Sequence, residues 1–180
     1  MILTLFANAQ SPGDKPAESV DSATAKTADP KLHADAIRLV EVSRTRQRIQ
    51  DNLRQTVDDG GKQMMEKCPR CTVEYRGEWE KRFLERTNID DYVAVFVRAY
   101  EKYFTDAEIN ELIVFQKEKE ASKDASPPPA LKEKLSSVMP SVLGEIMGGC
   151  AGIGAKLGAE IGAEIEREHP EYLKPETNKP

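Results

Sequence analysis

Apolar residues recur at intervals of three and four along most of this 180-residue chain. That spacing places them on one face of an α-helix. The sequence contains no stretch that alternates apolar and polar residues as a half-buried strand does, and it contains no convincing repeat. The apolar positions of the successive segments are Leu32, Ala36, Ile37 and Val40; Ile49, Leu53, Val57 and Met64; Tyr75, Trp79 and Phe83; Tyr92, Val93, Phe96, Val97, Tyr100 and Phe104; Ile109, Leu112, Ile113 and Phe115; and Leu131, Leu135, Val138 and Met139. The chain is therefore predicted to be an all-α bundle of about five to six helices.

Polar and small residues between these segments predict where helices begin and end. Asp29-Pro30 combines an N-cap carboxylate with a proline in the first turn, and Ser43 can cap the second helix. The pair Gly60-Gly61 either ends that second helix or loosens it. Asn88 can terminate the third helix. Thr105-Asp-Ala-Glu108 is a capping box, because the threonine and the glutamate can each satisfy the other's backbone N–H.

The last helix is predicted to be long, glycine-rich and kinked by a proline. The prolines 127–129 form a stiff spacer, and Pro128 or Pro129 can serve as the first helical residue. Pro140 then falls inside the helix, where a kink is expected. On a helical wheel Gly154, Gly158 and Gly162 form a ridge. Each costs about 1 kcal/mol relative to alanine. The ridge thus predicts close approach of another helix, from the bundle or from a second subunit.

The same wheel assigns one apolar face to the whole of this last helix and places Cys150 in its middle. We therefore expect Cys150 to be buried and the least reactive of the three cysteines. The residues of this predicted face are Leu143, Met147, Cys150, Leu157, Ile161 and Ile165.

The two ends of the chain differ from its centre. Residues 1–9 resemble the end of a signal peptide, with a short apolar run before Ala7-Asn8-Ala9, but they lack a basic region. Residues 10–29 are polar and small and are predicted to be a disordered leader. A single helical domain is expected over 30–168, and a disordered, proline-containing tail over 169–180.

Charge and composition narrow the class of partner. The net charge of −5 argues against nucleic acid, whose binders carry a basic face. The charge-free run in the glycine-rich region, Ile146 to Ala155, is far shorter than the ~20 residues of a membrane-spanning helix, so no transmembrane span is expected.

A known family resembles the second half of the chain. The stretch Tyr103 to Ile109, followed by Met139-Pro140 and Leu157-Gly158, resembles the family called domain of unknown function 2059. The resemblance covers roughly 92–165 and implies a small bacterial protein, usually exported, all-helical and without an established activity. Family members usually follow the capped helix with an aromatic residue and a tight Ser-Pro-x-Gly turn. Here Gln116 and a longer charged segment stand in that place.

Cys68-Pro69-Arg70-Cys71 is the motif with a chemical interpretation. Two thiols at this spacing can exchange with other disulfides, and the motif resembles a glutaredoxin active site. Such sites follow a strand, however, and here a helix is predicted before the motif. The alternatives are a local Cys68–Cys71 bridge that staples a helical corner, a bridge from either residue to Cys150, or reduced thiols.

Other candidates for chemistry have simpler explanations. His33 and His169 lie near the two ends of the chain without the spacing of a zinc site, so no metal site is predicted. Asp90-Asp91 fits the start of a helix, and Glu160 with Glu164 fits a solvated face. The aromatic positions between 92 and 104 fit core packing better than a ligand groove. No catalytic residue and no cofactor are predicted.

The leading hypothesis is a non-enzymatic exported protein, periplasmic or secreted, that binds a partner or has a structural role. Its partner would be an unknown protein, or a second copy of the chain, docked on the C-terminal helix. The alternative function is a thiol–disulfide redox protein that uses Cys68 and Cys71, and a third is a module that lies on a lipid surface. Cytoplasmic location is the alternative to export.

Overall fold

The computed structural model describes residues 29–175 apart from residue 123. Within that range the chain forms six α-helices and one short 3₁₀-helix, which confirms the all-α bundle. The expected signal remnant (1–9), nearly all of the expected leader (10–29) and the last residues of the tail lie outside the described part. The elements are α1 (Pro30–Val42), α2 (Thr45–Lys67), α3 (Val73–Arg86), α4 (Ile89–Tyr103), α5 (Asp106–Ala121), α6 (Pro129–Glu168) and η1 (Pro170–Tyr172).

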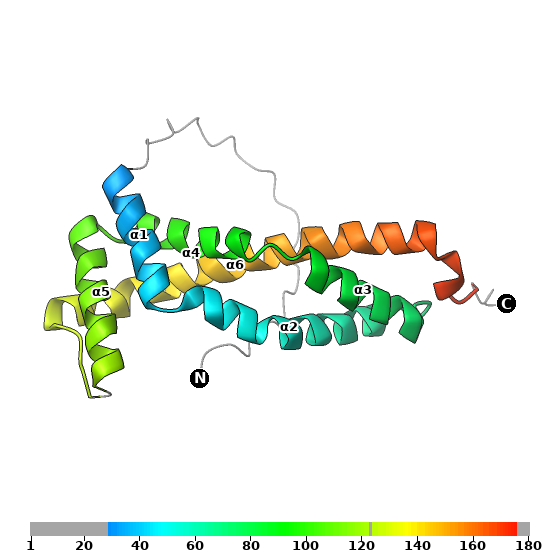
Figure 1. The fold of residues 1–180 in the computed structure, drawn as a ribbon, viewed down its shortest axis with the longest axis horizontal. Helices are drawn as coiled ribbons and strands as arrows, with labels where there is room; N and C mark the ends of the chain where they lie inside the picture. The colour runs from blue at the N-terminus through cyan, green and yellow to red at the C-terminus, as the bar shows by residue number, and fades with distance from the viewer. Residues whose placement is uncertain (1–28, 123, 176–180) are drawn as a thin grey trace.

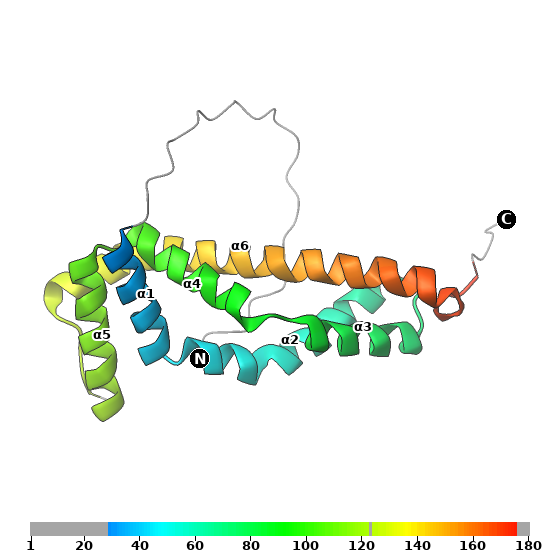
Figure 2. The ribbon, with the colours of Figure 1, turned by 45° about the horizontal axis from the view of Figure 1, so that its top comes forward.

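The molecule is elongated, and α6 runs along most of its length (Figure 1). Helices α4 and α5 pack on the first half of α6, and α1 packs on those two helices. Helix α3 packs on the second half of α6, and α2 packs on α3 and α4. Figure 2 shows α6 along one edge of the molecule, with α2, α3 and α4 on its other side. One face of α6 is therefore covered and the opposite face is open.

Two hydrophobic clusters share α6. The first contains Leu39 of α1, Ile109 of α5 and Val142 of α6, each at most 2% exposed. The second contains Phe83 of α3 and Ile161 of α6. The buried face of α6 thus changes side along the helix, because Val142 and Ile161 are roughly 100° apart at 100° per residue.

This rotation corrects the single apolar face expected for the last helix. Leu143 is 37% exposed and Met147 is 41% exposed, whereas the adjacent Val142 and Ile146 are buried. A single apolar face would be buried only if one partner packed along the whole helix. The first half of α6 packs on α4 and the second half on α3, so two different faces are buried.

Capping residues account for most helix starts. The side chains of Asp29, Thr72, Asn88 and Thr105 each accept a backbone N–H in the first turn of a helix, and Thr105 with Glu108 completes the predicted capping box. Pro129 opens α6 as expected. These local signals fix the order of the elements without reference to tertiary contacts.

Two boundary expectations, at Ser43 and Asn88, are wrong, and at Gly60-Gly61 the alternative that the pair ends the helix is excluded. Ser43 ends α1 instead of capping α2, and α2 follows Arg44, which has a positive φ of 53°. The Ser43 hydroxyl accordingly donates back to the Val40 carbonyl at 3.2 Å. Helix α2 continues through Gly60-Gly61 to Lys67. Asn88 caps the start of α4, after α3 has ended at Arg86.

The beginning of the predicted disordered tail is structured. Residues 170–172 form the turn η1, and Leu173 pairs with Cys71 as an antiparallel bridge. The amide of Thr72 donates to the Tyr172 carbonyl at 3.1 Å, and the amide of Lys174 donates to the Arg70 carbonyl at 2.8 Å. Composition indicated disorder, but these bonds between distant parts of the chain supply the order.

Candidate functional site

The two cysteines of the Cys-Pro-Arg-Cys motif form a disulfide at the corner between α2 and α3. Their Cα atoms are 5.4 Å apart. Cys68 ends α2 and is half-buried, whereas Cys71 lies just before α3 and is only 2% exposed. The amide of Cys71 also donates to the Cys68 carbonyl at 3.0 Å. The bridge is thus part of a tight turn, and the paired segment around Leu173 lies against it.

The three glycines of the predicted packing ridge face the aromatic side chains of α3. An added Cβ at Gly158 would lie 3.0 Å from the ring of Trp79, and one at Gly162 would lie 3.1 Å from the Tyr75 hydroxyl. At Gly154 the nearest atoms, from Phe83 and Tyr92, are 3.8 Å away. The neighbouring surface is therefore made of aromatic side chains of α3, with Tyr92 of α4 at one end, all within the same chain, and it is tightest at Gly158.

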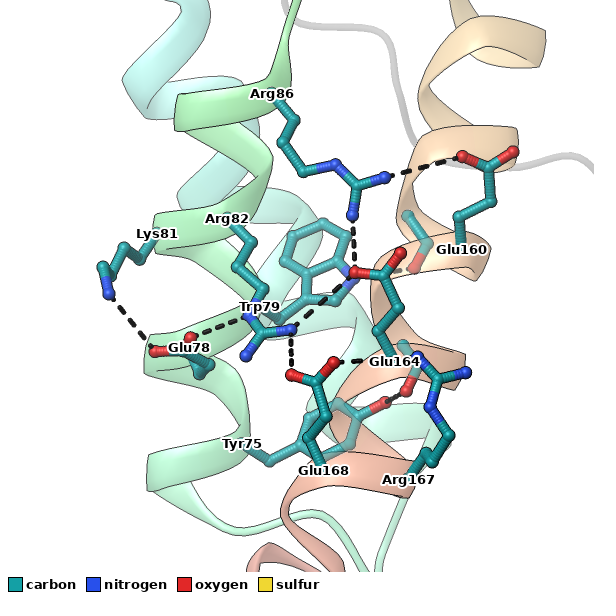
Figure 3. A network of polar contacts seen from close by, with 12 residues as sticks. Tyr75, Glu78, Trp79, Lys81, Arg82, Arg86, Glu160, Glu164, Arg167 and Glu168 are labelled. Atoms are coloured by element: carbon teal, nitrogen blue, oxygen red, sulfur yellow. Dashed lines mark hydrogen bonds and ion pairs between the residues drawn. The ribbon is translucent and has the colours of Figure 1, made fainter.

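Two hydrogen bonds hold the aromatic side chains in this groove. The indole N–H of Trp79 donates to the Gly158 carbonyl at 3.0 Å, and the Tyr75 hydroxyl donates to the Gly162 carbonyl at 3.3 Å. Figure 3 shows both side chains pointing from α3 toward α6. Burial is the main reason that the pKa of Tyr75 is raised. Each ring thus keeps its polar atom satisfied while its apolar part packs on glycine.

Trp79 also contacts α2. Its ring lies 3.5 Å from the position of a Cβ at Gly60. The indole therefore sits between a glycine of α2 and a glycine of α6. Sequence reasoning misses this arrangement, because it considers Gly60-Gly61 only as a pair that ends or loosens the second helix. The available signal is a glycine in one predicted helix and the single tryptophan in the next.

A ladder of ion pairs borders the aromatic groove. Arg82 of α3 lies 2.7 Å from Glu78 and 2.8 Å from Glu168, and Arg86 lies 2.6 Å from Glu164 (Figure 3). The Arg82 guanidinium is the main cause that lowers the pKa of both Glu78 and Glu168. Glu164 therefore faces α3, which corrects its interpretation as part of a solvated face.

The remaining cysteine lies away from the disulfide. Cys150 of α6 is half-buried and unpaired. Burial raises the pKa of its thiol, which lowers the fraction of reactive thiolate at neutral pH. In the described structure a Cys68–Cys71 bridge excludes pairing of either residue with Cys150.

The other candidates for chemistry serve in structural contacts. His33 pairs with Glu101 at 2.5 Å, and His169 pairs with Glu171 at 3.0 Å while its ring stacks on Tyr172. Across residues 29–175, leaving out 123, no three His, Cys, Asp or Glu side chains are grouped as a metal site would require. Asp90 lies in the first turn of α4, where its charge favours the helix. The aromatic side chains of α4 pack against the first hydrophobic cluster.

The open side of α6 is the surface feature that sequence reasoning did not identify. By length and composition alone α6 could cross a membrane. Only 11% of its apolar 18-residue window is buried inside the molecule, so most of this window is exposed. Leu143 and Met147 are exposed there. The expectation that no segment spans a membrane stays a prediction.

Comparison with known proteins adds no relative: no family model, no curated protein and no solved structure matches the chain. The resemblance to domain of unknown function 2059 therefore stays a prediction.

Proposed function

We propose that this protein is a non-enzymatic binding or structural module of an oxidising compartment, the periplasm or the cell exterior. The observation that carries the proposal is the position of the disulfide. It closes the corner between α2 and α3, its Cys71 sulfur is buried, and the segment around Leu173 pairs with it. A bridge in such a position stabilises the fold, and bridges of this kind persist in exported proteins.

Replacing both cysteines tests the structural role. The Cys68→Ser/Cys71→Ser variant is expected to lose about 2 kcal/mol of stability by the chain-entropy estimate for a short loop. The measurement is the thermal midpoint beside an insulin-reduction assay of the unaltered protein. A lower midpoint with no reductase activity in the unaltered protein supports the proposal. Reductase activity that the variant lacks would contradict it.

The oxidising location has its own test. Mass spectrometry of the protein recovered from the periplasmic fraction or medium, with and without alkylation, gives the mature N-terminus and the state of each cysteine. We expect one bridge between Cys68 and Cys71 and one alkylated thiol at Cys150. Recovery from the cytoplasm alone, with three alkylated thiols, would contradict export.

A thiol–disulfide redox function is the alternative, and the partial exposure of Cys68 favours it. An attacking thiolate needs access to one sulfur only, and Cys68 follows the last residue of α2 and is half-buried. The alternative predicts that the bridge opens in mild dithiol buffers without loss of helix. Reduction that occurs only together with unfolding would argue for the structural role.

A further inference from the structure

The open face of α6 has a regular composition. Six exposed positions follow one another at alternating steps of four and three residues, and together they define what we term the outer face of α6: Ser137, Ser141, Gly144, Gly148, Ala151 and Ala155. Alternation of three and four is the spacing by which one helix packs along another. Every side chain on this face is small and none is charged.

The glycines of the outer face have no explanation within one chain. Gly144 and Gly148, and Gly152 beside them, have no atom within 4 Å of an added Cβ. The inward glycines differ. An added Cβ would lie 2.6 Å from the Val95 side chain at Gly149 and 3.0 Å from the Trp79 ring at Gly158. Glycine in a helix is less favourable than alanine unless close packing requires it. The exposed Met147 at the border of the same face adds apolar surface that water contacts.

One acidic and one basic residue at the border of the outer face indicate which charges a partner surface must carry. Glu145 and Lys156 stand at the two ends of the charge-free run 146–155. Eleven residues separate them, so they lie on the same edge of the helix, within roughly 20° of each other. Lys156 is exposed and has no ion-pair partner in the described part of the chain. Glu145 is 42% exposed beside its partner Lys102.

An identical helix in the antiparallel orientation satisfies these charges. A two-fold axis near the middle of the charge-free run places each Glu145 beside Lys156 of the other copy, and it does so twice. A parallel pair forms neither contact, because Glu145 of one copy and Lys156 of the other then stay eleven residues apart along the helix axis. The six residues of the outer face are exposed, and Figure 2 shows α6 along an open edge of the molecule, so a second helix can approach it.

We propose that the outer face of α6 is the self-association surface of this protein, and that two copies pair there through antiparallel α6 helices. The inference names the partner of the binding role proposed above and rests on that role. It also assigns the Glu145–Lys156 pairs as the contacts that fix the orientation.

The first experiment measures the mass of the full chain in solution by light scattering and sedimentation. The unaltered protein is expected to be a concentration-dependent dimer. Gly148→Leu is expected to be a monomer with unchanged helix content, since nothing lies near its Cβ. Gly77→Leu is the matched control, because Gly77 of α3 is equally open but lies off the outer face, and it should leave the dimer intact.

The second experiment tests orientation. Glu145→Lys and Lys156→Glu should each raise the dissociation constant at least tenfold, and the double exchange should restore it. In a Cys150→Ser background, Ala151→Cys lies near the two-fold axis and should form an intermolecular disulfide. Ser137→Cys lies far from that axis and should not.

Two results would overturn the pairing. One is a monomer at every concentration; if that monomer also binds anionic vesicles, the face is assigned to a lipid surface instead. The other is rapid cross-linking through Ser137→Cys, which would show parallel helices. A monomer without insulin-reductase activity removes the pairing and leaves the proposed function standing, whereas reductase activity removes the proposed function itself.

Discussion

At the residue scale, Trp79 is the side chain on which three helices meet. Its indole donates to the Gly158 carbonyl of α6 and lies over Gly60 of α2. The ring can occupy this space because neither glycine carries a Cβ. The fit is closest at Gly158, where no side chain can be added unless the indole moves.

Substitution at Gly158 should therefore destabilise the protein. Gly158→Leu is expected to lower the free energy of unfolding by up to about 2 kcal/mol, because overpacking of up to about 3 kcal/mol outweighs the roughly 1 kcal/mol that a better helix former returns. Gly77→Ala is the matched control; its Cβ meets nothing within 4 Å, so it should stabilise by up to about 1 kcal/mol. Thermal and urea unfolding measure both. An unchanged midpoint for Gly158→Leu would refute the close contact with Trp79.

Cys150 should react slowly in the folded protein. Burial raises the pKa of its thiol above the ordinary value of 9.0, so less thiolate is present at any pH below it. We expect alkylation by iodoacetamide at pH 8 to be slower in buffer than in urea, and the pH at which the rate rises to lie higher in buffer. The measurement is the rate of mass gain over a pH series. Equal rates in buffer and urea would contradict this placement.

At the element scale, the docking of α3 on α6 combines apolar contact with ion pairs. The aromatic side chains of α3 occupy the glycine groove, and the Arg82 and Arg86 guanidinium groups reach the glutamates of α6 beside it. Arg82 is only 18% exposed, so solvent screens its pairs less than it screens the pairs at the surface. The groove determines the distance between the helices, and the ion pairs fix their register.

The same ion pairs predict a loss of stability in acid. Arg82 holds the pKa of Glu78 and Glu168 below the ordinary value of 4.5. The folded state thus binds fewer protons than the unfolded state, and this contribution, complete above pH 4.5, is lost as pH falls through the lower folded values. The thermal midpoint should fall below about pH 4.5. Arg82→Gln should flatten that fall, and Lys132→Gln, at an exposed position of α6 outside these ion pairs, should not. Parallel acid profiles for the two variants would refute the role of Arg82.

Sequence periodicity predicts where the helices lie, but it does not predict which face of each helix is buried. Spacing and capping residues located six helices and the break at Cys68, because these depend on local chemistry. The face of α6 could not be read from spacing, because α4 covers Ile146 and α3 covers Ile161 on different sides of one helix. Gly149, which has the tightest apolar contact of the inward glycines, was missed for that reason. The ridge at Gly158 can be predicted, because three glycines at four-residue spacing lower the stability of an isolated helix. Close packing against another helix is then expected to compensate.

At the scale of the whole molecule, α6 contributes buried side chains to both hydrophobic clusters. Leu39 and Ile109 belong to one cluster, and Phe83 and Ile161 belong to the other. Each cluster needs its own half of α6 to be helical. Helix α6 is continuous from Pro129 to Glu168. Loss of one cluster therefore removes the packing of one half of α6, and the other half then adjoins an unpacked helical segment. We therefore expect the two halves to unfold together.

The position of the tryptophan makes this testable. The chain has one tryptophan, and Trp79 packs in the second cluster, so its fluorescence reports that cluster while far-ultraviolet circular dichroism reports all helices. Leu39→Ala removes a side chain that is 2% exposed in the first cluster, and it should cost about 2–5 kcal/mol. If α6 couples the clusters, both signals shift to the same lower urea midpoint. A fluorescence midpoint that stays in place while circular dichroism shows an earlier transition would mean that the halves fold independently and that α6 only joins them.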